Sequence, residues 1–347
     1  MGAEPLVWIL WRRRKGDLDQ MLRLVQALGW RYEIKKLSFR SPGIPALAQL
    51  LVKPPSEPLV PPWPDLILCA EALPSIIARR LKAKSHGAIK TVCIGRPAGT
   101  PSAFDLVITT AQYRLAPAAN IVELPMPLSA VKFERSSLAG DNGARRPVIA
   151  LLAGGSSFPD ILDRSAARHM MAQVHRYTEQ RRGALVVVTS PRTDQIVANL
   201  LAETVKAPHR LHVFGCGENH YEQTLAAADE IIVTSDSVSM AADALATGKP
   251  VYVYPLPRKL HLQWQLVEWL YRHAVVRRAP WLGPMRWLFD AGVIESSADR
   301  RLLFSQLVGE RRLSWFGGAP PVPRPDASRR GAEEAVKRVR ALIAQSP

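Results

Sequence analysis

Hydrophobic residues in the first 130 positions form short runs, and these alternate with stretches in which apolar residues have helical spacing. Runs rich in β-branched or aromatic side chains predict strands, and they cover residues 6–10, 32–37, 65–70, 90–95 and 105–110. Apolar residues three and four positions apart predict helices at 17–29 and 73–85, and Gly29 ends the first. This rhythm predicts a parallel sheet covered by helices on both faces.

The same rhythm restarts after residue 147. Strands are predicted at 147–153, 184–189, 231–234 and 251–254 and from 210 onward, and helices at 161–180, 194–205, 221–229, 260–276 and 331–345. The polar stretch 134–147 between the halves has no periodicity and is interpreted as a linker. The sequence therefore predicts an α/β protein with two doubly wound Rossmann-like domains facing a cleft. The predicted ranges are 1–140 and 141–316, followed by a Pro-rich segment and a C-terminal helix at 317–347.

Composition narrows the possible partners. The 347 residues suit two domains, and 47% hydrophobic residues are enough for two cores. The net charge of +16 is spread over both halves and favours nucleic acid, an anionic membrane face or phosphorylated small molecules. We disfavour nucleic acid, since the sequence has no Cys/His finger spacing, aromatic RNP run or basic heptad region. It has no metal-binding pattern either.

The three cysteines and the N-terminus indicate a reducing compartment. Cys69 and Cys93 lie in predicted strands and are expected to be reduced core residues, and Cys216 has no partner at metal-binding spacing. The first apolar run is too short for a signal peptide, and its charges follow it. No apolar stretch approaches the roughly 18 residues of a membrane span. We therefore expect a cytoplasmic protein.

Polar loops follow the predicted strands of the second half, where open α/β sheets bind ligands. Gly154 and Gly155 have no side chains, so their N–H groups could face an anion together with the Ser156 hydroxyl. An ordinary strand–helix turn is the alternative. Ser190 and Arg192 follow the next strand, where a guanidinium suits a diphosphate, although a surface arginine explains the pattern equally well.

The stretch 231–256 combines a polar corner with a helix that contains one acid. Ser235 or Ser237 would make a good N-cap, and Asp236 is favourable at the positive end of a helix. Capping does not explain Asp243, which lies among small and apolar residues. It would either accept hydrogen bonds from a ribose diol or point to solvent.

In the first half, the loop after the first strand carries four successive cations, at 12–15. Asp17 follows them near the start of a helix, and it is either a catalytic base or an N-cap beside a solvated loop. The helix dipole and the cations would favour its charged form. Glu71 follows the third strand at the corresponding position and is a second candidate base.

Several of these segments occur together in one known family. The segments are WILWRRRKGDLDQMLRLVQALGWRYEIKKL, PPWPDLILCAEALP, LLAGGSS, VVVTSPRT and GENHYEQTLAAADEIIVTSDSVSMAADALATGKPVYVYPL. In order and spacing they resemble the bacterial glycosyltransferase family that is similar to the plant "elongated mitochondria" fission proteins. The block TSDSVSM…TGKPV is specific to it. The loop RRRKGDLDQ departs from the family pattern but keeps Gly16, Asp17 and Gln20. After the predicted strand at 65–70, AEALP stands where the family commonly has a Gly-Arg pair.

The resemblance implies a GT-B-like architecture in which the second domain binds a nucleotide-sugar donor and the first an acceptor. The donor-binding residues it implies are Gly154, Gly155, Ser156, Ser190, Arg192, Glu218, Asn219, Ser235, Asp236, Ser237, Met240 and Asp243. Asp17 or Glu71 would be the catalytic base. Lys15, Gly16 and Gln20 would lie on the acceptor side.

The sequence thus predicts a metal-independent, inverting glycosyl transfer to an envelope or lipid-linked saccharide, with no cofactor and a UDP-sugar favoured over a CMP-sugar. A non-catalytic membrane-surface adaptor and a nucleotide-sugar epimerase are the alternatives. Residues 281–289 (WLGPMRWLF) would either dock on an anionic inner membrane face or, slightly favoured, form a core or interdomain contact. Donor base, sugar, acceptor, oligomeric state and catalysis itself stay open.

Overall fold

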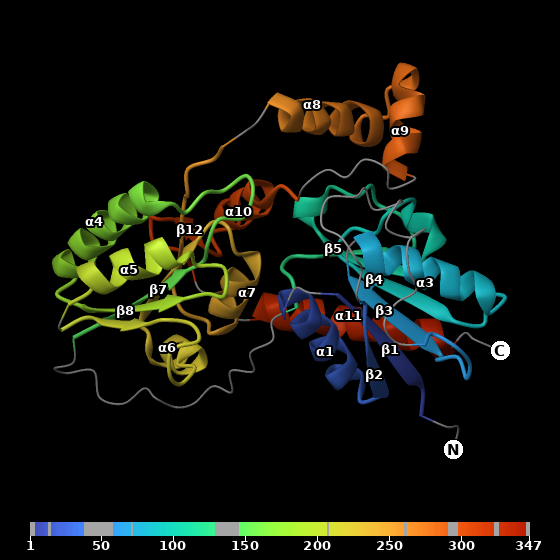
Figure 1. The fold of residues 1–347 in the computed structure, drawn as a ribbon, viewed down its shortest axis with the longest axis horizontal. Helices are drawn as coiled ribbons and strands as arrows, with labels where there is room; N and C mark the ends of the chain where they lie inside the picture. Colours follow the sequence, from blue (N-terminus) through green and yellow to red (C-terminus); the bar gives the residue numbers. More distant parts are fainter. Residues whose placement is uncertain are drawn as a thin grey trace. The chain divides into compact units, whose positions relative to one another are not determined.

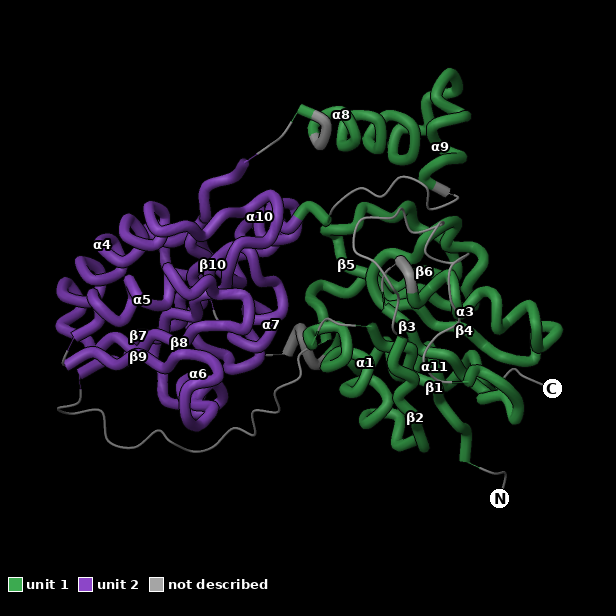
Figure 2. The backbone as a smooth tube through the Cα atoms, viewed as in Figure 1, with its two compact units in different colours: residues 1–130, 261–299, 330–347 green, residues 131–260, 300–329 purple. Residues whose placement is uncertain are grey.

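The computed structural model describes residues 4–12, 15–37, 58–70, 72–128, 146–206, 208–259, 262–290, 298–322 and 326–344. The chain forms two compact units (Figure 2), which are made of residues 1–130, 261–299 and 330–347 and of residues 131–260 and 300–329. Each unit is built on a parallel six-stranded sheet, which confirms the predicted α/β class with two Rossmann-like sheets. The predicted linker 134–147 lies outside the described residues except at its last two positions.

Unit 1 carries the strand order β2-β1-β3-β4-β5-β6. Its strands are β1 (Leu6–Trp11), β2 (Arg31–Lys36), β3 (Leu66–Ala70), β4 (Lys90–Ile94), β5 (Leu106–Thr110) and β6 (Ile121–Leu124). Its first helices are α1 (Lys15–Leu28) and α3 (Ala72–Lys84). The strands match the predicted runs, and β6 is an addition that the sequence pattern did not predict.

Alternating side chains of this sheet fill two separate cores, as the pleat of a strand requires. Val7 and Ile9 of β1 pack in one core with α1, whereas Trp8 and Leu10 pack in the other with α3. Cys69 and Cys93 are fully buried in the second core, as predicted. Helices therefore cover both faces of the sheet (Figure 1).

Two segments from late in the chain belong to unit 1, unlike the predicted ranges of 141–316 and 317–347. The first contains α8 (Leu262–Tyr271), a π-helical turn (Arg272–Val276) and α9 (Gly283–Asp290). The second is most of α11 (Asp326–Ala344). Ala335 and Val339 of α11 are fully buried beside α1 in unit 1, which is why this helix groups with the first sheet.

The first late segment is attached to unit 1 by polar contacts. Arg114, which follows β5, forms ion pairs with Glu268 of α8 and with Asp299. Within the stretch 281–289, Leu282 and Phe289 are buried, but Trp281 and Trp287 are exposed. The sequence slightly favoured a core or interdomain contact for this stretch, and burial supports that interpretation for only part of it.

Unit 2 carries the strand order β12-β11-β10-β7-β8-β9. Its strands are β7 (Val148–Ala153), β8 (Ala184–Thr189), β9 (Arg210–His212), β10 (Glu230–Thr234), β11 (Val251–Tyr254) and β12 (Ser314–Trp315). Its helices are α4 (Arg164–Gln180), α5 (Gln195–Thr204), α6 (Tyr221–Ala227), α7 (Val238–Ala246) and α10 (Arg300–Gly309). Every predicted strand of this half is present, and β12 and α10 were not predicted.

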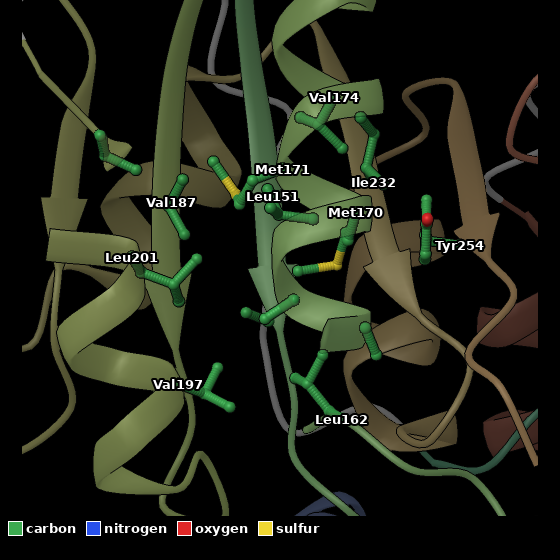
Figure 3. Close-up of a cluster of buried hydrophobic side chains, with 14 of the residues drawn as sticks. Leu151, Leu162, Met170, Met171, Val174, Val187, Val197, Leu201, Ile232 and Tyr254 are labelled. Carbon is green, nitrogen blue, oxygen red and sulfur yellow. The ribbon is translucent and has the colours of Figure 1, made fainter. Parts of the chain in front are cut away.

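One core of unit 2 lies between the sheet and the helices α4 and α5. Figure 3 shows Met170 and Met171 of α4 and Leu201 of α5 pointing toward Leu151 and Val187 of the sheet. All five side chains are almost fully buried. Because a fully buried Leu or Met contributes about 1.5–3 kcal/mol, this core holds the strand ends, and the loops that follow them, in fixed positions.

Each sheet has one point where the strand order reverses. In unit 2 the chain passes from β7 outward through β8 and β9, then returns to the other side of β7 with β10. In unit 1 the reversal lies between β1 and β3. Ligands of open α/β sheets bind outside the carboxyl ends of the strands at such points, so both edges are candidate sites.

Two structural features bear on membranes and metals. Among the described helices, none combines the length and apolar character needed to cross a bilayer. Among the described residues, no group of three or more His, Cys, Asp and Glu side chains is arranged to hold a metal ion.

Candidate functional site

The reversal point of unit 2 is built around the buried carboxylate of Asp236, directly after β10. Its side chain is fully buried. One oxygen accepts the Gly155 N–H at 3.0 Å and a guanidinium N–H of Arg192 at 2.8 Å. The other oxygen accepts the hydroxyl of Thr234 at 2.6 Å. Burial raises the pKa of Asp236, while the charge of Arg192 acts in the opposite direction.

The sequence suggested that the N–H groups of the glycines after β7 face a ligand. In the structure they instead donate to this cluster. The Gly154 N–H donates to the Thr234 hydroxyl at 2.8 Å, and the Gly155 N–H donates to Asp236. Neither glycine has a positive φ. Both are needed for close approach, because a Cβ on Gly154 would lie 2.3 Å from the Asp236 carboxylate and one on Gly155 would lie 2.0 Å from the Arg192 carbonyl oxygen. The Ser156 hydroxyl accepts the Leu162 N–H at 3.0 Å.

Arg192 reaches the cluster from the loop between β8 and α5. The loop is fixed by its own hydrogen bonds, since the Arg192 N–H donates to Ser190 Oγ and the Ser190 N–H donates to Thr193 Oγ1. Thr193 in turn donates to the Ala153 carbonyl at the end of β7. One terminal nitrogen of Arg192 pairs with Asp236, yet 44% of the side chain is exposed. The structure thus holds a guanidinium at this edge with part of it open to solvent.

The serines on either side of Asp236 have separate structural roles. Ser237 is the N-cap of α7 and accepts the Met240 N–H, which confirms one of the two predicted caps. Ser235 instead accepts the Leu256 N–H at 3.0 Å and so joins the end of β10 to the loop after β11. Met240 is half-buried in the first turn of α7. The positive end of α7 therefore lies at the same edge as Arg192.

Asp243 is half-buried on α7 and has a protein partner that the sequence did not reveal. It accepts the hydroxyl of Tyr221, the first residue of α6, at 2.9 Å. Burial and then the charge of Asp243 raise the pKa of the Tyr221 hydroxyl well above its ordinary value. This contact explains why an acid is tolerated in an otherwise small and apolar helix. A ribose contact for Asp243 stays a prediction.

The loop before α6 contains the other predicted donor-binding residues. Gly215 and Gly217 have φ values of +80° and +78°, so the loop depends on glycine. Asn219 accepts the Tyr221 N–H at 3.2 Å and so helps to start α6, while Glu218 is exposed. The structure brings neither side chain into the hydrogen bonds around Asp236, and their roles toward a donor stay predictions.

Two histidines in contact flank this loop. The rings of His212 and His220 lie 4.3 Å apart and are tilted by 39°. Burial and then the charge of His220 lower the pKa of His212. The pair fixes the two ends of the loop against each other.

Unit 1 has a pocket at the carboxyl ends of its strands, and Asp17 and Gln20 of α1 line it. Its other polar lining residues, Thr109, Thr110, Gln112 and Tyr113, lie at the end of β5 or directly after it. The Thr110 hydroxyl is buried and has no hydrogen-bond partner among the described residues. Buried polar groups are almost always paired, so this hydroxyl marks a place for a ligand or ordered water.

The other acceptor-side predictions are only partly visible. Gln20 donates to the carbonyl of Gly16 at 3.3 Å, and Lys15 is exposed at the start of α1. Glu71 and two of the four cations, Arg13 and Arg14, lie outside the described residues. Thr110, Gln112 and Tyr113 belong to the run ITTAQY (108–113), a polar strand end at β5 that the sequence pattern offered as a signal for this site.

Comparison with known proteins adds a family and a fold. The family model described as "Mitochondrial fission ELM1" matches residues 15–295. Mitochondrial fission protein ELM1 of Arabidopsis thaliana is 31% identical over 87 residues, which are 25% of this chain and 20% of that protein. The matched stretch therefore spans about a fifth of the length of this curated relative.

Two solved structures are similar over nearly the whole chain. The S. aureus MnaA–UDP co-structure has a TM-score of 0.50 at 12% identity and covers 99% of both chains. The glycotransferase of kitacinnamycin has a TM-score of 0.49 at 14% identity, over 100% of this chain and 95% of the other. At such low identity the first likeness supports the fold alone, which is GT-B-like.

Proposed function

The chain belongs to the mitochondrial fission ELM1 family, and from this premise we propose that it is a glycosyltransferase that uses a nucleotide-sugar donor. The acceptor in this proposal is an envelope or lipid-linked saccharide. The observation that carries the proposal is Arg192, a partly exposed guanidinium that a buried carboxylate holds at the strand-order reversal of a GT-B-like fold. Anionic ligands of such folds bind at this edge.

The donor diphosphate would bind to Arg192 beside the positive end of α7. Arg192 has five N–H donors in a rigid fork, and Asp236 occupies only one terminal nitrogen. When the bond between the anomeric carbon and the phosphate oxygen breaks, negative charge develops on the leaving diphosphate. A guanidinium already held in place stabilises that charge without having to reorganise. The proposal needs no metal ion, and a UDP-sugar is favoured over a CMP-sugar.

The acceptor would bind at the mouth of the pocket of unit 1, since the pocket itself, at about 30 Å³, has room only for water-sized groups. Asp17 would take the proton of the acceptor hydroxyl while its oxygen forms a bond to the anomeric carbon, with inversion. Gln20, Gln112 and the Thr110 hydroxyl supply donors and acceptors for the other hydroxyls of a saccharide. Glu71 stays the alternative base.

Donor binding is tested by saturation-transfer NMR with UDP-, GDP-, ADP- and CMP-sugars. We expect at least one of them to bind, and Arg192→Ala to weaken that binding. Arg164→Ala is the matched control, since Arg164 is an exposed arginine on α4 of the same unit. Failure of every sugar nucleotide to bind would contradict the proposal. Chemistry is tested by donor hydrolysis, which Asp17→Asn should abolish and Asp243→Ala should retain.

A non-catalytic adaptor is the second candidate, and one observation favours it. The N–H groups of Gly154 and Gly155, which could have received a phosphate, are donated to Thr234 and Asp236. An adaptor predicts no nucleotide-sugar binding at all. An epimerase instead predicts conversion of the donor sugar in the absence of acceptor, which the same NMR samples would reveal.

A further inference from the structure

The segment 262–289 of unit 1 exposes large apolar side chains. On α8, Leu262, Leu266 and Trp269 are exposed, and their spacing of four and three residues places them on one helix face. Trp281 and Trp287, before and on α9, are 67% and 65% exposed. The rings of Trp269 and Trp281 lie 6.2 Å apart, so the two elements share one surface. Figure 1 shows α8 and α9 as neighbouring helices.

The opposite face of the same segment is attached to the body of unit 1. Glu268 is buried and pairs with Arg114. Tyr271 is almost fully buried, with the guanidinium of Arg96 4.0 Å from its ring centroid and the Phe289 ring at 5.4 Å. The segment is therefore amphipathic. One face packs on the body of unit 1, and the other face exposes the tryptophans.

The charge on this segment is mainly positive. Between residues 262 and 290 the sequence has two acids, Glu268, whose charge is paired with Arg114, and Asp290 at the end of α9. Four arginines in the same stretch are exposed: Arg272, Arg277, Arg278 and Arg286. Exposed tryptophans beside arginines are typical of segments that lie in the headgroup region of a bilayer, since the indole is amphipathic and cations attract anionic lipids.

We propose that this docking surface, formed by Leu262, Leu266, Trp269, Trp281 and Trp287 with the four arginines, binds the surface of an anionic lipid bilayer. The tryptophans lie at the level of the headgroups and the arginines contact lipid phosphates. The charge selects an anionic bilayer over an uncharged apolar partner. This inference is independent of glycosyl transfer, because none of these residues belongs to the two candidate sites.

The test is flotation of the full chain with vesicles of phosphatidylcholine alone or of equimolar phosphatidylcholine and phosphatidylglycerol. We expect binding to the anionic vesicles only, weakened by added salt. Arg277→Gln with Arg278→Gln should lower the partition coefficient about thirtyfold, at about 1 kcal/mol for each arginine. Trp281→Ser with Trp287→Ser should lower it by at least about tenfold.

Matched controls come from unit 2. Arg164→Gln with Arg168→Gln removes two exposed arginines from α4, and Ile196→Ser removes an exposed apolar side chain from α5. Both should bind vesicles like the unchanged chain. Brominated lipids should also quench tryptophan fluorescence of the unchanged chain, a readout that requires no variant to fold.

Three results would overturn the proposal. They are equal binding to neutral and anionic vesicles, absence of binding or quenching, and folded tryptophan variants that bind normally. A concentration-dependent dimer that the Trp281→Ser/Trp287→Ser variant abolishes would assign the surface to a second copy of the chain instead.

Discussion

Thr110 and Thr234 are the last residues of β5 and β10, one in each unit, and both are buried at the carboxyl edge of a parallel sheet. The Thr234 hydroxyl accepts the Gly154 N–H and donates to Asp236. The Thr110 hydroxyl has no partner among the described residues. The same residue at the same kind of position is thus satisfied by the protein in unit 2 and left unsatisfied in unit 1.

The two sheet edges therefore offer a ligand different groups. In unit 2 both carboxylate oxygens of Asp236 and the hydroxyl of Thr234 have partners, and these hydrogen bonds hold in place a partly exposed guanidinium, Arg192. In unit 1 the pocket itself contains an unpaired polar atom, so a ligand or water there gains a hydrogen bond that the protein does not supply. Unit 2 presents a charged group at the rim, and unit 1 has a buried hydroxyl, unpaired among the described residues, beside a pocket of about 30 Å³, which has room for ordered water.

The largest effect is expected for Gly155→Ala in unit 2. The new Cβ would lie 2.0 Å from the backbone carbonyl oxygen of Arg192, so the loop must move. We expect a loss of about 3 kcal/mol in unfolding free energy, measured by urea denaturation. Gly309→Ala in the same unit has no atom within 4 Å of the new Cβ and should cost nothing. Equal effects of the two variants would refute the close packing around Asp236.

The next largest effect is expected for Thr234→Val, which tests the hydroxyl that is hydrogen-bonded in unit 2. It leaves the Gly154 N–H and one Asp236 oxygen without a partner, and both are buried. We expect a loss of about 2 kcal/mol in unfolding free energy. A calorimetric melt that shows no destabilisation would mean that these hydrogen bonds do not form in solution.

Thr110→Val is the matched substitution in unit 1 and should have the opposite sign. Valine has nearly the shape of threonine, and it removes a buried hydroxyl that has no partner among the described residues. We expect a gain of up to about 1 kcal/mol in the same melt. A loss as large as that of Thr234→Val would show that the hydroxyl is already paired and would remove the contrast between the two edges.

The smallest effect concerns pH and Asp236→Asn. Burial raises the pKa of Asp236 above its ordinary value of 3.8, so the folded chain binds this proton more tightly than the unfolded chain. The contribution of this group to stability is therefore largest below pH 3.8, and it falls as pH rises from there through the raised pKa. The stability of the unchanged chain relative to Asp236→Asn should fall over that window and level off above it. A difference that rises with pH would mean that Arg192 outweighs burial.

Much of the fold could be predicted because its signals are local. The strand runs, the end of α1 at Gly29 and the Ser237 cap depend on residues close together in sequence. The grouping of α8, α9 and α11 with unit 1 could not be predicted in this way. It depends on contacts such as Arg114 with Asp299, which are 185 residues apart.

The candidate site, too, could be predicted only in part. The sequence correctly indicated which loops follow the strands, but not where their hydrogen bonds go. The N–H groups of Gly154 and Gly155 seemed free for a ligand because their acceptors, Thr234 and Asp236, lie about 80 residues away. The contact of Asp243 with Tyr221, which joins residues 22 positions apart, was also missed.

Isothermal titration calorimetry of the full chain with UDP and with a UDP-sugar is the sharpest test of a donor site at Arg192. We expect saturable binding at one site, weakened at least about tenfold in Arg192→Ala, since hydrogen bonds to charged groups are worth about 1.5–3 kcal/mol. Arg164→Ala should bind like the unchanged chain. Absence of binding, or equal binding by Arg192→Ala, would contradict the assignment of the donor site to the reversal point of unit 2.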